Sequence, residues 1–159
     1  MTIEIRAMSV DDAKALIGWR YEGDYSMYNI VVDDTEEEAI YLTNPENHFY
    51  GIYRKEEFIG HAVFKAEGRV PGGDYSRDAL DVGVGLRPDL TGQGIGSEII
   101  AHVLEFGRIL YDATCFRATI AAWNTRAQRA TEKNGFTITD RFQAHNSGKE
   151  FVIMIRDES

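Results

Sequence analysis

Three glycines at alternate positions are the residues of this sequence best suited to binding a ligand. Gly92, Gly94 and Gly96 stand in the stretch RPDLTGQGIGSEII, directly before an apolar run with helical spacing. At the start of a helix, backbone N–H groups lack intrahelical partners and the helix dipole adds partial positive charge. Such a turn binds an anion, typically a phosphate, and glycine lets the ligand approach the backbone closely. A tight strand-to-helix turn without a ligand would use the same residues, so the glycines alone leave both interpretations open.

Two familiar phosphate-binding patterns do not match this chain. A Walker A loop requires Gly-Lys-Ser or Gly-Lys-Thr, and neither tripeptide occurs in the sequence. A dinucleotide fingerprint that began at Gly83 and Gly85 would have Pro88 in place of its third glycine. The turn therefore belongs to neither class.

The pattern of apolar residues predicts strands and helices that alternate along the chain. Ser9, Asp33 or Asp34, and Asn124 are expected helix N-caps, and Gly135 is an expected C-terminal residue. The expected strands lie at 3–9, 48–53, 58–66, 79–87, 115–123, 136–146 and 149–156. The expected helices lie at 10–20, 33–43, 95–110 and 124–134, with a loop or short helix at 21–30 and a loop at 67–78.

One apolar face is expected on the helix that follows the glycine turn. Its members share helical spacing and are Ile95, Ile99, Val103, Phe106 and Leu110. With no internal repeat and no linker, the 159 residues predict a single α/β domain with a mixed sheet.

Composition narrows the class of protein. A formal net charge of −9 argues against general nucleic-acid binding and suits a cationic small molecule or a basic peptide, although it can also serve solubility alone. No apolar stretch reaches the roughly 18 residues that span a bilayer, so no membrane association is expected. The one cysteine, Cys115, begins an expected buried strand and is interpreted as an inert core thiol in a cytoplasmic protein.

A second stretch, WNTRAQRATEKNGF, helps to decide between the two interpretations of the glycine turn. Together the two stretches resemble the GCN5-related N-acetyltransferase (GNAT) family, whose acetyl-CoA motif opens a helix and here reads Thr91 to Gly96. The family's second motif has an Asn, an Ala three residues later and a closing E-K-x-G-F, which here are Asn124, Ala127 and residues 132–136. The resemblance covers the whole chain, 1–159, as a single N-acetyltransferase domain, and it implies a mostly antiparallel mixed sheet flanked by helices. The stretch LDVGVGLRP is similar to the branch that acetylates ribosomal-protein N-termini and related amines.

The resemblance also implies a set of cofactor-binding residues for acetyl-CoA. The main chain of the glycine turn would hold the pyrophosphate, at Gly92, Gln93, Gly94, Ile95, Gly96 and Ser97. The end of the preceding strand would pair with the amides of pantetheine, at Val84, Gly85 and Leu86. Asn124 would hydrogen-bond the cofactor arm, unless it is only a helix cap. Arg126, Arg129 and Lys133 share a helix face and would meet the nucleotide's phosphates, or form a solvated stripe.

Two departures from the family concern the chemistry. Thr131 occupies the position of a tyrosine that often protonates the leaving thiolate, and its hydroxyl is far too weak an acid to replace a phenol. Thr119 replaces a glutamate that some branches carry on the strand before the second motif. Acetyl transfer stays feasible, because holding two reactants together and stabilising the developing oxyanion supply much of the acceleration. No metal is expected, since the four histidines have no ligand spacing.

Asp81 is the candidate general base, because the ribosomal-protein branch often carries a carboxylate on this strand. The alternative is a solvent-facing strand residue or an ion-pair partner of Arg87. The acceptor pocket is expected at Trp19, Asp24, Tyr25 and Tyr28, since an aromatic and acidic wall suits a protonated amine. The same aromatic residues could instead be core.

Three functions remain in competition at this point. The first is an acetyl-CoA-dependent N-acetyltransferase acting on a primary amine, which could be a protein N-terminus, a polyamine or an amine-bearing small molecule. The second is a non-catalytic acyl-CoA-binding module, and the third is an interaction domain whose glycine turn is empty. The protein is expected to be a monomer or a homodimer.

Overall fold

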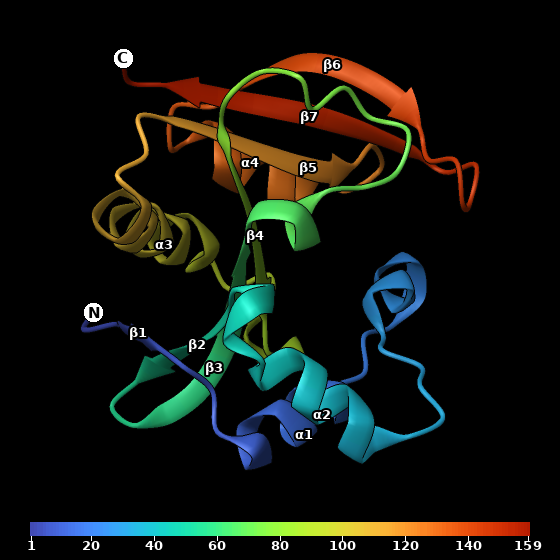
Figure 1. Cartoon of the computed structure of the whole chain (residues 1–159), viewed down its shortest axis with the longest axis vertical. Coiled ribbons are helices and arrows are strands. Elements are labelled where there is room, and N and C mark those ends of the chain that lie inside the picture. The colour runs from blue at the N-terminus through green and yellow to red at the C-terminus, as the bar shows by residue number, and fades with distance from the viewer.

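A computed structural model describes all residues, 1–159, as one mixed α/β domain. Its seven-stranded sheet has the order β1-β2-β3-β4-β5-β7-β6. All neighbouring strands are antiparallel except β4 and β5, which are parallel. Figure 1 shows β4 running between the two halves of the sheet, with β1, β2 and β3 on one side and β5, β6 and β7 on the other. The predicted fold class, a mostly antiparallel sheet flanked by helices, is confirmed.

The observed elements match the predicted order. The strands are β1 (Glu4–Arg6), β2 (Phe49–Arg54), β3 (Glu57–Phe64), β4 (Leu80–Leu86), β5 (Cys115–Ala121), β6 (Thr137–Gln143) and β7 (Glu150–Asp157). The α-helices are α1 (Val10–Gly18), α2 (Thr35–Thr43), α3 (Gly96–Tyr111) and α4 (Thr125–Glu132). Short 3-10 turns are η1 (Gly23–Tyr28), η2 (Pro45–Asn47), η3 (Lys65–Gly68) and η4 (Pro88–Leu90).

Local hydrogen bonds explain where three of the helices begin. Ser9, Asp34 and Asn124 each accept a hydrogen bond at the N-terminus of α1, α2 and α4, from the N–H three residues ahead. These are caps that the sequence predicts, with Asp34 rather than Asp33 at the second helix.

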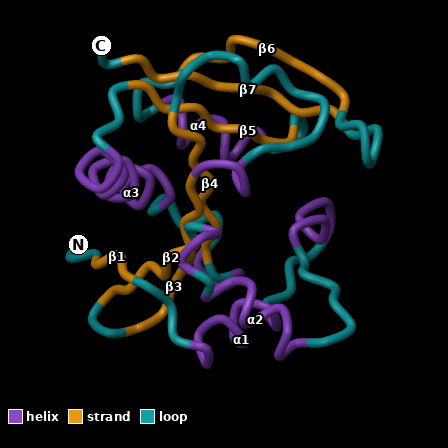
Figure 2. The backbone as a smooth tube through the Cα atoms, in the orientation of Figure 1, coloured by secondary structure: helices purple, strands orange, loops and turns teal.

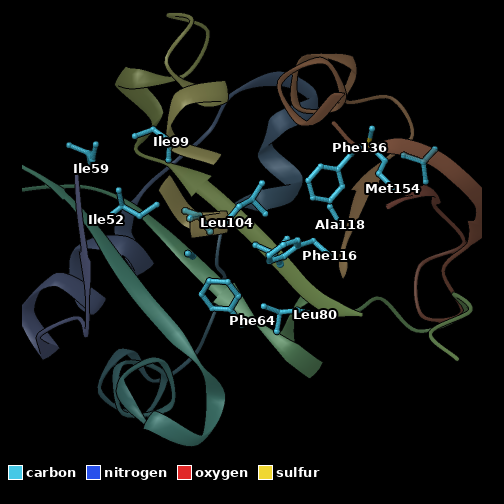
Figure 3. Close-up of a cluster of buried hydrophobic side chains, with 14 of the residues drawn as sticks. Ile52, Ile59, Phe64, Leu80, Ile99, Leu104, Phe116, Ala118, Phe136 and Met154 are labelled. Atoms are coloured by element: carbon cyan, nitrogen blue, oxygen red, sulfur yellow. The ribbon is translucent and has the colours of Figure 1, made fainter. Parts of the chain in front are cut away.

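Two apolar clusters hold the helices on opposite faces of the sheet. The larger cluster joins α3 to the sheet, and Figure 3 shows Phe64, Leu104 and Phe116 close together within it. The smaller cluster lies between α1, α2 and the face of β2 and β3 that carries Phe49 and Phe58. Burial of apolar area on both faces stabilises the sheet.

The predicted face of α3 is only partly correct. Ile99 and Val103 are fully buried, but Leu110 is 50% exposed. The helix approaches the sheet closely at Gly107, where a Cβ would lie 2.8 Å from Phe64 Cε1. The buried stripe therefore shifts away from Leu110 in the last turns.

Three further observations concern the predicted loop at 67–78, Cys115 and the length and polarity of the helices. The predicted loop at 67–78 begins inside η3. Cys115 is half-buried rather than part of the core, and partial burial raises the pKa of its thiol. None of the helices is both long and apolar enough to cross a membrane.

Candidate active site: a split sheet and a glycine turn

The sheet splits between β4 and β5. The two strands pair only at Leu80 with Phe116 and at Asp81 with Arg117. Beyond these pairs β4 stays paired with β3 as far as Leu86, but has no strand on its other edge. In Figure 2 the strands spread in two directions from β4. One edge of β4 is therefore open over its C-terminal half.

The open edge presents unpaired backbone groups. The Arg87 N–H donates to the Ile59 carbonyl at 2.8 Å, so residue 87 faces β3. Because N–H and C=O groups alternate sides along a strand, Gly85 also faces β3, whereas Val84 and Leu86 face the split. Of the three residues expected to pair with pantetheine, two thus direct their peptide groups into the opening.

The glycine turn follows this edge directly. Gly92 and Gly94 have φ of +73° and +81°, a left-handed conformation that disfavours other residues. No atom lies within 4 Å of where a Gly94 Cβ would be, so the surface there is bare. Gly96 is the first residue of α3 and has no positive φ; its Cβ position lies 3.7 Å from Ala130 Cβ. The three glycines thus have two roles: a left-handed turn at Gly92 and Gly94, and helix packing at Gly96.

The N-terminus of α3 has no side-chain cap. Ile95 stands at the N-cap position and no side chain bonds to the first N–H groups, in contrast to the other three α-helices. These N–H groups need a partner, and an anion is a suitable one. Nearby side chains bond elsewhere, since Gln93 donates to the Asp89 carbonyl at 2.7 Å and Asn134 holds the Ser97 carbonyl at 2.9 Å. The main chain of the turn is therefore free to bind a ligand.

A cationic side chain stands beside the turn. The Arg126 Nη1 lies 3.0 Å from where a Gly92 Cβ would be, and its guanidinium stacks over the Tyr25 ring at 4.2 Å. Arg129 is exposed and forms no ion pair within the chain. Arg126 therefore lies beside the turn, and a role for Arg129 at the phosphates stays a prediction.

The far wall of the opening is aromatic and polar. Asn124 is 6% exposed; its Oδ1 caps α4 and its Nδ2 donates to the Tyr28 hydroxyl at 2.9 Å. Tyr25 and Tyr28 both pack against Trp123, with ring centroids 4.9 and 6.0 Å apart. The segment η1 therefore lies against the N-terminus of α4.

An open cleft lies beside this aromatic wall. It is lined by Asp24, Met27, Ala122, Trp123, Lys149 and Glu150. Of the residues predicted for the acceptor pocket, Asp24 lines the cleft, and Tyr25 and Tyr28 contact its Trp123. Trp19 lies apart from them, stacked on Phe58 at 5.1 Å against the smaller core cluster. Trp19 therefore packs against the core, which is the alternative that the sequence left open for these aromatic residues.

A tyrosine occupies the end of the open edge. The Tyr21 hydroxyl donates to the Leu86 carbonyl at 2.5 Å, and burial raises the pKa of Tyr21 to about 12. Burial also raises the pKa of Tyr28. Both phenols are thus uncharged hydrogen-bonding groups at neutral pH.

Asp81 lies in a buried ion pair. Its two carboxylate oxygens accept from Arg117 Nε at 2.6 Å and Nη2 at 2.8 Å, and Arg69 Nε donates at 2.8 Å. The side chains of Asp81 and Arg117 are each 1% exposed. The predicted alternative partner, Arg87, bonds instead to Asp89 and Glu57. A general base needs a free oxygen within reach of the acceptor, so this geometry favours a structural role for Asp81 over the predicted catalytic one.

Two further side chains bear on the proton chemistry. The Thr131 hydroxyl donates to the Ala127 carbonyl inside α4 at 2.8 Å and is buried, so it faces no ligand. His61 pairs with Gly85 across β3 and β4, and its buried Nδ1 has no hydrogen-bond partner. Burial lowers the pKa of His61 to about 4, which leaves the ring neutral at neutral pH.

The arrangement combines two kinds of recognition. The open β4 edge can pair with an extended chain of amides, as an added strand would. The uncapped helix and Arg126 can bind phosphate groups at the end of that chain. No three or more His, Cys, Asp or Glu side chains lie close enough together to hold a metal ion.

Comparison with known families agrees with this geometry. Residues 2–137 match the family model described as the acetyltransferase (GNAT) domain. The chain belongs to this family. The description does not distinguish branches of the GNAT family, so similarity to the ribosomal-protein branch stays a prediction.

Solved structures share the GNAT fold at low sequence identity. A GNAT acetyltransferase from Bacillus anthracis is 18% identical with a TM-score of 0.77, over 99% of this chain and 96% of that one. The aminoglycoside acetyltransferase AAC(6')-Ib, solved with ribostamycin and coenzyme A, is 18% identical with a TM-score of 0.76, over 99% and 94%. A spermidine N-acetyltransferase chimera from Vibrio cholerae and hSSAT is 15% identical with a TM-score of 0.77, over 99% and 96%. No curated protein matches the sequence.

Sequence reasoning missed several residues around this candidate site. Tyr21 hydrogen-bonds to Leu86 of β4, Tyr75 hydrogen-bonds to Thr119 of β5, and Arg117 and Arg69 hold Asp81. Only Arg117 carried a local signal: as a charged residue in an apolar strand, it requires a buried partner.

Proposed function

We propose that this GNAT chain transfers the acetyl group of acetyl-CoA to a primary amine. The observation that carries the proposal is the continuity of the open β4 edge with the uncapped glycine turn. Acetyl-CoA has the matching order of groups: a thioester, an arm with two amides, and a pyrophosphate. The arm would pair with Val84 and Leu86 as a missing strand, and the pyrophosphate would meet the N–H groups of Gly92 to Ser97.

Binding would exchange partners on both sides of the split. Asn124 already donates to Tyr28, and Leu86 already accepts from Tyr21. A pantetheine arm that reaches these groups replaces or joins the tyrosines, so η1 adjusts when the cofactor binds. Arg126, beside Gly92, adds charge attraction for the phosphates in a chain of net charge −9.

The acceptor side of the split suits a cation. Asp24 and Glu150 supply carboxylates around the Trp123 cleft, and Tyr25, Tyr28 and Trp123 supply ring faces. The related folds include enzymes named for aminoglycosides and spermidine, which carry several amines. The proposed acceptor is therefore a primary amine on a polyamine, an amine-bearing small molecule or a protein N-terminus.

The reaction requires little from individual side chains. The amine nitrogen attacks the thioester carbonyl, and an N–H on the open edge stabilises the oxyanion that forms. The carbon–sulfur bond then breaks, the nitrogen gives up one proton and the sulfur gains one, so the products are the amide and coenzyme A as the thiol. Holding the two reactants in one cleft removes the entropic cost of their encounter.

Two measurements test the proposal. Calorimetry with coenzyme A tests the cofactor site, and no binding would favour an interaction domain with an empty turn. Free thiol release from acetyl-CoA with a panel of amines tests catalysis. Binding without thiol release above background for any amine would favour the non-catalytic acyl-CoA-binding module.

A further inference from the structure

The loop between η3 and β4 is fixed over the sheet where the split begins. At its start Arg69 binds Asp81 of β4, and near its end the Arg77 carbonyl accepts from Arg117 Nη1 at 2.8 Å. The middle is held by the His145 N–H, which donates to the Pro71 carbonyl at 2.9 Å. Loops usually lie in solvent, and one held at three places can position a side chain.

Tyr75 is the side chain that this loop directs to the sheet. Its hydroxyl lies 2.8 Å from Thr119 Oγ1 and accepts from the Val70 N–H at 2.9 Å. The Arg117 guanidinium stands 4.8 Å from the centre of its ring. Because Val70 donates to the phenol oxygen, the hydroxyl proton is free to point to Thr119 or to a ligand.

Thr119 marks the level at which the strands separate. It lies two residues beyond Arg117, the last residue of β5 that pairs with β4. Side chains two residues apart in a strand share a face, so Thr119 and Arg117 lie on the face that carries Asp81. Across the split, the next β4 residue on this face is Gly83, which has no side chain to obstruct the opening. The Tyr75 hydroxyl therefore lies at the narrow end of the split.

The reacting end of the cofactor would lie at this same level. With the pyrophosphate at Gly92 to Ser97 and the arm along Val84 and Leu86, the thioester reaches toward Gly83 and Thr119. One residue of strand spans only about 3.3 Å, so the sulfur and the Tyr75 hydroxyl would be neighbours. Building on the proposed function, we propose that Tyr75 is the catalytic acid that protonates the leaving thiolate of coenzyme A.

The proposed step balances without a further reactant. As the tetrahedral intermediate collapses, the carbon–sulfur bond breaks and its electron pair goes to sulfur. Sulfur takes the proton of the Tyr75 hydroxyl, and the Val70 N–H stabilises the phenolate that remains. The proton released by the amine nitrogen returns to Tyr75 through the Thr119 hydroxyl. The products are the N-acetylated amine and the free thiol.

Other phenols of the chain are less suited to this step. Tyr21 and Tyr28 hydrogen-bond to Leu86 and Asn124, near the glycine-turn end of the split, and burial raises the pKa of both. Thr131, at the family's usual tyrosine position, bonds within its own helix. Tyr75 supplies from a loop the group that is missing at the usual position.

The test compares Tyr75→Phe with Tyr111→Phe. The control also removes one phenol hydroxyl, which lies 3.3 Å from the Tyr50 hydroxyl on a ring that packs against Phe64 of the larger core cluster. In Tyr75→Phe, kcat should fall at least about 10-fold while the KM for acetyl-CoA changes less than about 3-fold. The control should keep kcat within about 3-fold.

Each outcome separates this inference from its alternatives. A Tyr75→Phe variant with wild-type kcat, or with lower stability and wild-type turnover per folded molecule, would overturn the role of Tyr75 and leave the proposed function intact. If Tyr75→Phe does not fold, Thr119→Val removes the proton relay and must itself lower kcat selectively. Absence of thiol release by the wild type would instead refute the proposed function.

Discussion

The buried ion pair of Asp81 gives the sharpest stability prediction. Asp81→Asn keeps the size of the side chain and removes its charge, so Arg117 would be left buried at 1% exposure without a full countercharge. Removing one partner of a buried pair typically costs about 3–5 kcal/mol. The three short hydrogen bonds to Arg117 and Arg69 place this site in that range. For a domain of this size the loss corresponds to a melting temperature lower by roughly 6–20 °C.

Asp89→Asn is the matched control, because Asp89 also accepts two hydrogen bonds from one arginine, Arg87, but is exposed. An exposed pair contributes about 1 kcal/mol or less. Urea unfolding and calorimetry give the stabilities, and thiol release per folded molecule gives the activity. Asp81→Asn should be much less stable than Asp89→Asn, because only Asp81→Asn leaves a buried arginine without its countercharge. A variant as stable as the control that has lost turnover at least about 10-fold would refute the ion-pair account and restore Asp81 as the general base.

Three further predictions follow from the site and its surroundings. Gly94→Glu should weaken coenzyme A binding by more than about 2 kcal/mol, because the new side chain repels the phosphates and obstructs the bare turn. Gly148→Glu is the control, since Gly148 has a similar φ and open space around it, and it should leave binding unchanged. Equal affinities of the two variants by calorimetry would show that the turn is not part of the cofactor site. Thr131→Ala should leave turnover within about 3-fold, and a 100-fold loss with intact binding would make Thr131 part of the proton path. Burial lowers the pKa of His61 to about 4 in the folded chain, against about 6.5 in the unfolded chain. The unfolded chain therefore binds a proton first as pH falls, and the free energy of unfolding decreases between pH 6.5 and 4, by roughly 2 kcal/mol at pH 5 relative to neutral pH. In urea unfolding at pH 7.5 and 5, His61→Gln should lack this loss, and an unchanged pH dependence would contradict the burial of a neutral ring.

Local signals explain why most of the fold could be predicted from the sequence. Ser9, Asp34 and Asn124 cap helices through N–H groups only three residues away. The glycine turn is equally local, since a left-handed φ at Gly92 and Gly94 is a property of the turn itself. Apolar alternation indicated the order of the strands along the chain, and the GNAT resemblance implied that the sheet is mixed and mostly antiparallel.

The parts of the site that the sequence did not reveal depend on distant residues. Asp81 meets Arg117 across 36 residues, Tyr75 meets Thr119 across 44, and Tyr28 meets Asn124 across 96. Such contacts follow from which strands lie side by side, not from spacing along the chain. Trp19 shows the converse error: it is close in sequence to Tyr25 and Tyr28, yet α1 directs it to Phe58 and the core.

The transfer of an acetyl group from coenzyme A to an amine is the central claim, and isotopic labelling tests it most directly. The full chain is incubated with acetyl-CoA labelled in its acetyl group and with a polyamine, an aminoglycoside or a peptide with a free N-terminus. Free thiol and labelled product are then measured together. We expect at least one amine to acquire the label on nitrogen, with one thiol released for each label transferred and both signals reduced in Tyr75→Phe. Coenzyme A binding with no label on any amine, and no thiol above background, would contradict the account.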